Sequence, residues 1–90
     1  MYLIIKNNKI IDIIQKEIVP DKYTLSDNYK IIKKDINYII KDLKGYIVDI
    51  ILKDEKIPVD YYHIHLITTN VYRNQHYIIS SKRIKQLIDI

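Results

Sequence analysis

The most informative segment of the chain is residues 27–44, which have the sequence DNYKIIKKDINYIIKDLK. Its apolar side chains recur three and four residues apart, as on one face of an amphipathic helix; they are Tyr29, Ile32, Ile36, Ile39, Ile40 and Leu43. Ser26 is suited to cap the start of a helix, and Gly45 to the left-handed conformation that often ends one. The segment therefore predicts a long amphipathic helix from Asp27 to Lys44.

Strands are expected before this helix. Residues 2–6 and 10–15 are rich in isoleucine, a β-branched residue that favours strands. They are separated by Asn7-Asn8-Lys9, and asparagine tolerates the positive backbone angles of tight hairpin turns. The chain therefore begins with a predicted β-hairpin.

More strands and a second helix are expected after residue 45. Residues 46–53 and 57–69 predict two strands, and residues 71–73 and 76–79 predict a further hairpin. Ser80 or Ser81 is suited to cap a short final helix. The predicted fold is α+β: a small antiparallel sheet, in the order ββ-α-ββ(β)-α, with one long amphipathic helix and a short C-terminal helix packed on it.

The composition indicates a single small domain over residues 1–90. The chain has no cysteine, no apparent internal repeat and no linker, and a single glycine excludes glycine-rich phosphate loops. With neither a leader nor a membrane-length apolar run, we expect an intracellular protein that uses no membrane and no cofactor. The abundance of isoleucine, lysine and tyrosine, with no alanine, is typical of an AT-rich genome, such as that of a small virus or plasmid.

The basic charge favours nucleic acid, or another polyanion, as the partner. The net charge is +4 at pH 7, and residues 61–90 hold four cations against one carboxylate. On the predicted helix, lysines gather on one flank of the apolar face, where they suit contacts with phosphates. The predicted non-catalytic nucleic-acid-binding residues are Lys30, Lys33, Lys34, Lys41, Lys44, Arg73, Lys82, Arg83 and Lys85.

A protein-interaction module is the first alternative. Ile31 and Tyr38 are seven residues apart on the side of the predicted helix away from the core face. Two apolar residues in register can form a seam for a homodimer, or for a host protein if the chain comes from a virus or plasmid.

A metal-dependent nuclease is the second alternative. In a strand, His63 and His65 share one face, so both imidazoles can hold one divalent metal ion. The stretch His63-Ile64-His65-Leu66 resembles the His-hydrophobic-His motif of the HUH endonucleases, which act on single-stranded DNA. That resemblance implies a metal site at His63 and His65, with Tyr77 or Tyr72 as the nucleophile that attacks a DNA phosphate.

Overall fold

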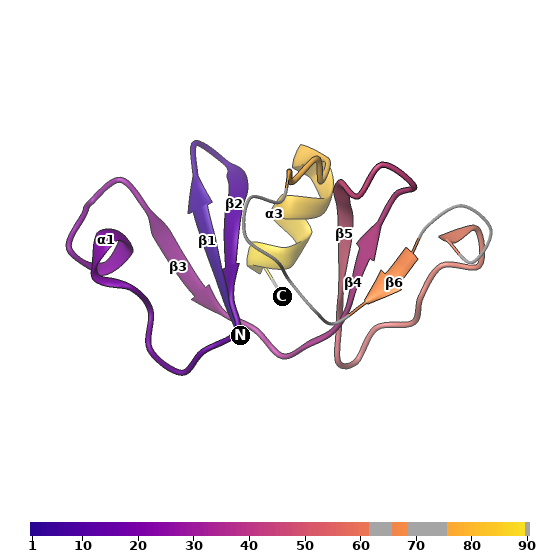
Figure 1. The fold of residues 1–90 in the computed structure, drawn as a ribbon, viewed down its shortest axis with the longest axis horizontal. Coiled ribbons are helices and arrows are strands. Elements are labelled where there is room, and N and C mark those ends of the chain that lie inside the picture. The colour runs from indigo at the N-terminus through magenta and orange to yellow at the C-terminus, as the bar shows by residue number, and fades with distance from the viewer. Residues whose placement is uncertain (62–65, 69–75, 90) are drawn as a thin grey trace.

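The structure is a computed structural model that describes residues 1–61, 66–68 and 76–89. Within these residues, six strands form two three-stranded antiparallel sheets. The sheets lie side by side, and the C-terminal helix lies between them (Figure 1). The molecule measures 41 × 26 × 23 Å. The coarse prediction of a mixed α+β fold is confirmed, but one sheet is replaced by two.

The first sheet has the strand order β2-β1-β3. Its strands are β1 (Tyr2–Lys6), β2 (Lys9–Ile14) and β3 (Lys30–Lys33). As predicted, Asn7 and Asn8 make the β1–β2 turn, with φ angles of 52° and 61°. The connection from β2 to β3 contains the one-turn helix α1 (Asp21–Thr24). β3 pairs with the edge of β1 that β2 leaves open.

The second sheet has the strand order β5-β4-β6. Its strands are β4 (Ile36–Lys41), β5 (Ile47–Leu52) and β6 (Leu66–Thr68). Gly45 lies in the β4–β5 turn with φ of +86°, a conformation that glycine adopts without strain. The predicted strand 46–53 is confirmed, but the predicted strand 57–69 is confirmed only over β6 among the described residues.

The predicted long helix over residues 27–44 is wrong. This segment contains β3 and β4, joined by Lys34 and Asp35. Its isoleucines meet helical spacing, but the adjacent pairs Ile31-Ile32 and Ile39-Ile40 also suit strands that are covered on both faces. Pairing with β1 and β5 gives these β-branched residues buried positions in sheets, so tertiary pairing outweighs the helical pattern. Neither expected cap acts on a helix here: Ser26 accepts a hydrogen bond from the Asn28 backbone at 3.2 Å.

The end of the chain agrees in part with the prediction. Residues 71–73 of the expected hairpin lie outside the described residues, and residues 76–79 form no strand; instead, Tyr77 makes an isolated parallel bridge to Ile47. The short final helix is confirmed as α3 (Ser81–Asp89). Ser80 is its cap, because the Ser80 hydroxyl accepts a hydrogen bond from the Arg83 backbone at 3.2 Å.

The two sheets are copies of one plan, which the sequence analysis missed. In each, a hairpin is followed by a long connection, and the third strand then pairs with the first strand of the hairpin. The register of the first and third strands is also the same in both sheets. A residue of these strands in the first sheet and its equivalent in the second sheet are 36 positions apart in the sequence. The equivalent pairs are Leu3 with Ile32 and Ile39 with Thr68, then Ile4 with Ile31 and Ile40 with Ile67. We call residues 1–35 the first half and residues 36–68 the second half.

The same side-chain interaction is made in both halves. The Tyr23 hydroxyl donates to Asp12 Oδ2 at 2.6 Å, and the Tyr61 hydroxyl donates to Asp49 Oδ2 at 2.8 Å. Each aspartate also accepts a hydrogen bond from the backbone of the next residue, at 2.8 and 2.7 Å. Each tyrosine closes a Pro-x-x-Tyr turn, with its N–H bonded to the carbonyl of Pro20 or Pro58. These contacts tie the long connection of each half to its sheet.

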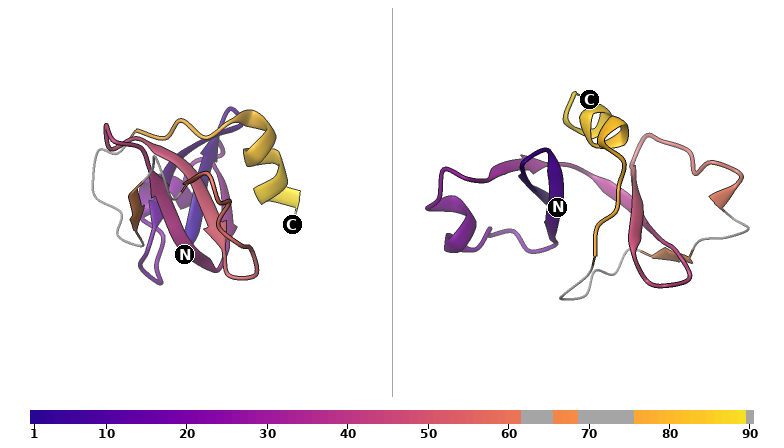
Figure 2. Two further views of the ribbon diagram at one scale, coloured as in Figure 1. Left: turned by 90° about the vertical axis from the view of Figure 1, so that its right-hand side faces the viewer. Right: turned by 90° about the horizontal axis from the view of Figure 1, so that it is seen from above.

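One hydrophobic core joins the two halves. It contains equivalent residues from both sheets, Leu3 with Ile39, Ile10 with Ile47 and Ile13 with Ile50. The helix α3 adds Ile84 and Leu87 to this core, and both are buried. Seen from above, α3 lies to one side of the two sheets, at a position between them along the long axis (Figure 2). The halves therefore share their main apolar contacts and do not form two separate cores.

Candidate polyanion interface

The predicted cationic residues do not gather on one surface. Lys30 and Lys33 are exposed on β3, while Lys44 is exposed in the β4–β5 turn. Lys34 is half-buried and Lys41 is buried. The expected helical flank therefore does not exist, and its lysines are divided between the two sheets.

The C-terminal cations also have different environments. Lys82 and Lys85 are exposed on α3, whereas Arg83 is held by carboxylates of the second half. Arg73 lies outside the described residues. Within the described part of the chain, the exposed cations of this region are thus Lys82 and Lys85.

Three other cation contacts cluster on the outer face of the first sheet. Each lysine nitrogen lies over a tyrosine ring, at 5.6, 4.9 and 5.9 Å from its centroid. The pairs are Lys6 with Tyr29, Lys22 with Tyr23 and Lys33 with Tyr2. We call these six residues the lysine–tyrosine face. Among them, only Lys33 was a predicted binding residue.

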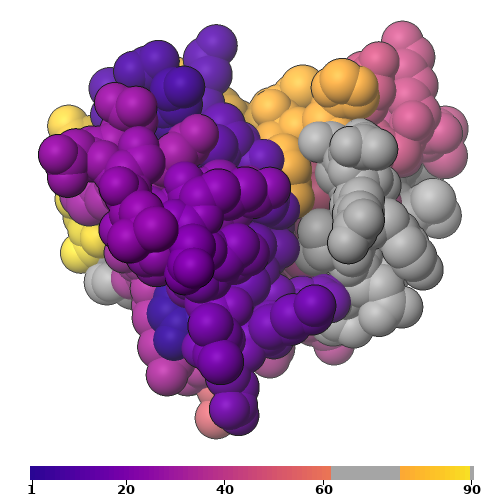
Figure 3. Space-filling view, turned by 60° about the vertical axis from the view of Figure 1, so that its left-hand side comes forward, coloured from indigo at the N-terminus to yellow at the C-terminus, as the bar shows by residue number. Residues whose placement is uncertain are grey.

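The topology explains why these side chains share a face. Alternation along β1 directs Leu3 and Ile5 to the core, so Tyr2 and Lys6 point the other way. Lys33 is the β3 residue paired with Tyr2, and α1 brings Tyr23 against Tyr29 with ring centroids 5.0 Å apart. Figure 3 shows this side of the molecule, where the first half (indigo to magenta) forms most of the surface.

Tyr23, the buried tyrosine of the lysine–tyrosine face, stays neutral at ordinary pH. Burial and the hydrogen bond to Asp12 raise the pKa of Tyr23 to about 12. Tyr61 has the same arrangement, and burial with its bond to Asp49 raises its pKa to about 12. Neither hydroxyl therefore adds negative charge to the surface.

The second half shows that the fold does not require these lysines. By strand register, Lys6 is equivalent to Asp42, and by the Pro-x-x-Tyr turn, Lys22 is equivalent to Asp60. The same backbone plan thus carries the opposite charge at both positions. Lysine at these two positions is therefore not required by the backbone plan that the halves share.

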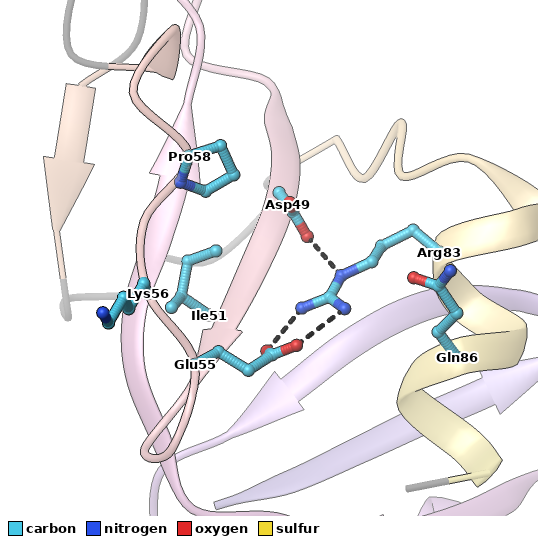
Figure 4. A pocket seen from close by; sticks show the side chains of 7 residues that line it. All are labelled: Asp49, Ile51, Glu55, Lys56, Pro58, Arg83 and Gln86. Atoms are coloured by element: carbon cyan, nitrogen blue, oxygen red, sulfur yellow. Dashed lines mark hydrogen bonds and ion pairs between the residues drawn. The ribbon is translucent and has the colours of Figure 1, made fainter.

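The strongest ion-pair cluster in the described residues lies elsewhere and is structural. Arg83 Nε bonds Asp49 Oδ1 at 2.9 Å, while Nη1 and Nη2 bond the two oxygens of Glu55 at 2.9 and 2.5 Å (Figure 4). Nη2 also donates to the Ile50 carbonyl at 2.7 Å. The side chain of Arg83 is 17% exposed and that of Asp49 is 8% exposed. The guanidinium therefore uses its hydrogen-bond donors within the chain and links α3 to the second half.

The protonation states agree with this geometry. Hydrogen bonds from Arg83 hold the pKa of Glu55 below its usual value, against the opposing effect of burial. Burial disfavours the charged form of Arg83, but the bonds to Glu55 and Asp49 raise its pKa above the ordinary value. A pocket of about 220 Å³ adjoins the cluster. Three of its charged lining residues, Asp49, Glu55 and Arg83, are already paired with one another.

Of the residues of the nuclease alternative, the structure describes only Tyr77. His63, His65 and Tyr72 lie outside the described residues. Tyr77 packs against the core, and burial raises its pKa above the ordinary value, which disfavours the phenolate of a nucleophile. No group of three potential metal ligands occurs within residues 1–61, 66–68 and 76–89.

The predicted dimer seam is also changed by the fold. Ile31 lies half-buried on β3, whereas Tyr38 is exposed on β4 of the other sheet. They therefore do not form one helical stripe. In the part of the chain that is described, no helix is both long enough and apolar enough to cross a membrane.

Comparison with known proteins places the chain in no family: no family model, no curated protein and no solved structure matches it. The two halves can be compared with each other instead, and the comparison separates residues that the shared fold requires from residues that it does not.

Two motifs in the sequence indicate that the halves are related. Residues 10–23, IIDIIQKEIVPDKY, and residues 47–61, IVDIILKDEKIPVDY, both begin Ile-x-Asp-Ile-Ile-x-Lys and end Pro-x-x-Tyr. Differences in turn and connection length hide the repeat, because the β4–β5 turn is one residue longer than the β1–β2 turn. In these two segments, the aspartate of the first motif is shared by both halves, whereas Lys22 is equivalent to Asp60.

Proposed function

We propose that the protein is a non-catalytic binding domain that binds nucleic acid, or another polyanion, through the lysine–tyrosine face of its first half. The observation that carries the proposal is the set of three lysines held over tyrosine rings, two of which are replaced by aspartate in the second half. Lysines serve as phosphate contacts because charge matters there more than exact geometry.

The distribution of charge over the whole surface supports the same proposal. Among the described residues, eleven lysines are exposed against seven carboxylates. The other four carboxylates, Asp12, Asp42, Asp49 and Glu55, accept hydrogen bonds within the chain. The exposed lysines therefore outnumber the exposed carboxylates by four, so the described surface is basic.

The test is a salt titration of binding to labelled DNA and RNA, both single- and double-stranded. We expect affinity to fall steeply with salt and to be weakened by the triple variant Lys6→Ala, Lys22→Ala and Lys33→Ala. Loss of about three phosphate contacts lowers the slope of log K against log salt by about two to three units.

Two further variants locate the site. The control Lys16→Ala, Lys53→Ala and Lys56→Ala removes the same charge from exposed positions outside the face and should have a much smaller effect. Lys82→Ala with Lys85→Ala tests the exposed cations of α3. Equal losses of affinity in the three multiple variants would indicate a nonspecific effect of charge and would contradict a defined face. Absence of binding at low salt would refute the proposed function.

A further inference from the structure

A second surface feature lies at the end of the β4–β5 hairpin. The rings of Tyr46 and His76 meet edge to face, with centroids 5.3 Å apart and planes at 72°. Both side chains reach solvent: Tyr46 is 37% exposed, and His76 is also exposed. Leu43 in the turn is 82% exposed and Ile78 is 53% exposed. We call these four residues the hairpin patch.

Backbone pairing places three of these residues, Tyr46, His76 and Ile78, side by side. The Ile47 N–H donates to the His76 carbonyl at 2.8 Å, and the Ile78 N–H donates to the Ile47 carbonyl at 2.8 Å. Tyr77, the residue between them, packs against the core with Ile47. By strand alternation, His76 and Ile78 point the opposite way, as Tyr46 does.

The repeat bears on the two patch residues that belong to the hairpin, Leu43 and Tyr46. Each hairpin turn is closed by one residue pair, Lys6 with Lys9 in the first half and Asp42 with Tyr46 in the second. The position of Tyr46 is therefore occupied by Lys9 in the first half, next to a turn made of two asparagines. A hairpin of the same plan is thus built with a polar turn in the first half, so the plan does not require an aliphatic residue at Leu43 or an aromatic residue at Tyr46.

We infer that the Tyr46–His76 pair is a stacking platform for the unpaired bases of single-stranded nucleic acid. Tyrosine and histidine rings are common stacking partners of splayed bases, and aliphatic neighbours such as Leu43 and Ile78 extend such a platform. Lys44 is exposed in the same turn and supplies a cation for the adjoining phosphate. The Asp42 carboxylate is turned towards the backbone, where one oxygen accepts the N–H groups of Lys44 and Tyr46, both at 2.9 Å. The inference rests on the proposed function and names its substrate class.

The test separates bases from phosphates. Binding is measured for a single-stranded oligothymidine, an abasic strand of the same length and a duplex, at one salt concentration. If bases stack on the patch, wild-type protein binds the oligothymidine at least about fivefold more tightly than the abasic strand. This preference should vanish in Tyr46→Ala and persist in Tyr46→Phe.

Two variants guard against misfolding and general charge effects. Tyr46→Lys introduces the residue found at the equivalent position of the first half, so the hairpin tolerates it; it should abolish the base preference without weakening the abasic complex. Tyr38→Ala removes an exposed tyrosine outside the patch and should leave the preference unchanged.

The outcomes distinguish this inference from the proposed function. Salt-dependent binding that is equal for the oligothymidine and the abasic strand overturns the stacking platform and leaves the lysine–tyrosine face intact. Binding to no nucleic acid overturns both. Self-association that Leu43→Asp abolishes, without any base preference, would make the hairpin patch a protein contact and also overturn the inference.

Discussion

Arg83 is the single residue with the largest set of polar contacts in the described chain. Its guanidinium satisfies a buried aspartate, a half-buried glutamate and a backbone carbonyl. Removing one partner of such a cluster is costly, because the remaining charges lose their compensation in a poorly solvated site. We therefore assign Arg83 to stability and not to phosphate binding.

The variant Arg83→Ala should lower the free energy of unfolding by about 2 kcal/mol. The value is below that of a fully buried pair because Glu55 is partly solvated. Chemical denaturation provides the measurement, with Lys82→Ala as a control that should stay within about 0.5 kcal/mol of wild type. Equal denaturation midpoints for Arg83→Ala and Lys82→Ala would show that the cluster contributes nothing.

The same cluster predicts how stability depends on acid pH. The folded-state pKa of Glu55 is lowered from its ordinary value of 4.5, so its contribution is fully present above that pH. It is lost as the pH falls below 4.5 through the lower folded-state pKa. Denaturation midpoints measured over this range should fall less steeply in Arg83→Ala than in wild type, and parallel curves would contradict the assignment.

Among the elements, α3 depends on its first turn. The Ser80 hydroxyl accepts the N–H of Arg83 and thereby satisfies one of the unpaired donors of the helix start. The cap also fixes the residue whose side chain binds the second half. The beginning of α3 therefore controls both the helix and its attachment.

Ser80→Ala should destabilise the protein by about 1 kcal/mol. Ser81→Ala is the matched control, because Ser81 is exposed and is the first residue of the helix, not its cap. Thermal or chemical unfolding measures both. A larger loss in Ser81→Ala than in Ser80→Ala would place the cap one residue later than the structure does.

For the whole molecule, the shared core predicts one cooperative unit built from two similar halves. Ile13 and Ile50 are equivalent, are at most 4% exposed and belong to the same core. Either half alone would expose the apolar face that the other half and α3 cover. We therefore expect the halves to unfold together.

Ile13→Ala and Ile50→Ala should each cost about 3 kcal/mol, within the usual range for truncating a buried isoleucine. Both variants should show a single unfolding transition, in which protection from hydrogen exchange is lost together in the two sheets. A variant in which one sheet loses protection while the other keeps it would show that the halves are independent.

Local patterns in the sequence were sufficient for several elements. The Asn7-Asn8 turn, the strand over 46–53 and a final helix capped at Ser80 or Ser81 were all predicted, because turn geometry, strand alternation and capping depend on neighbouring residues. The α+β class follows from the same information. The cationic character of the surface was also predictable, since it depends on composition.

The tertiary structure decided the features that depend on contacts between residues far apart in the sequence. Residues 27–44 satisfy a helical pattern, yet pairing with β1 and β5 makes them strands of two sheets. The role of Arg83 depends on acids 28 and 34 residues away, and the lysine–tyrosine face depends on strand register. In a chain with 23 isoleucines, apolar spacing alone does not select among partners. Long-range pairing makes that selection, because it buries side chains on both faces of each sheet.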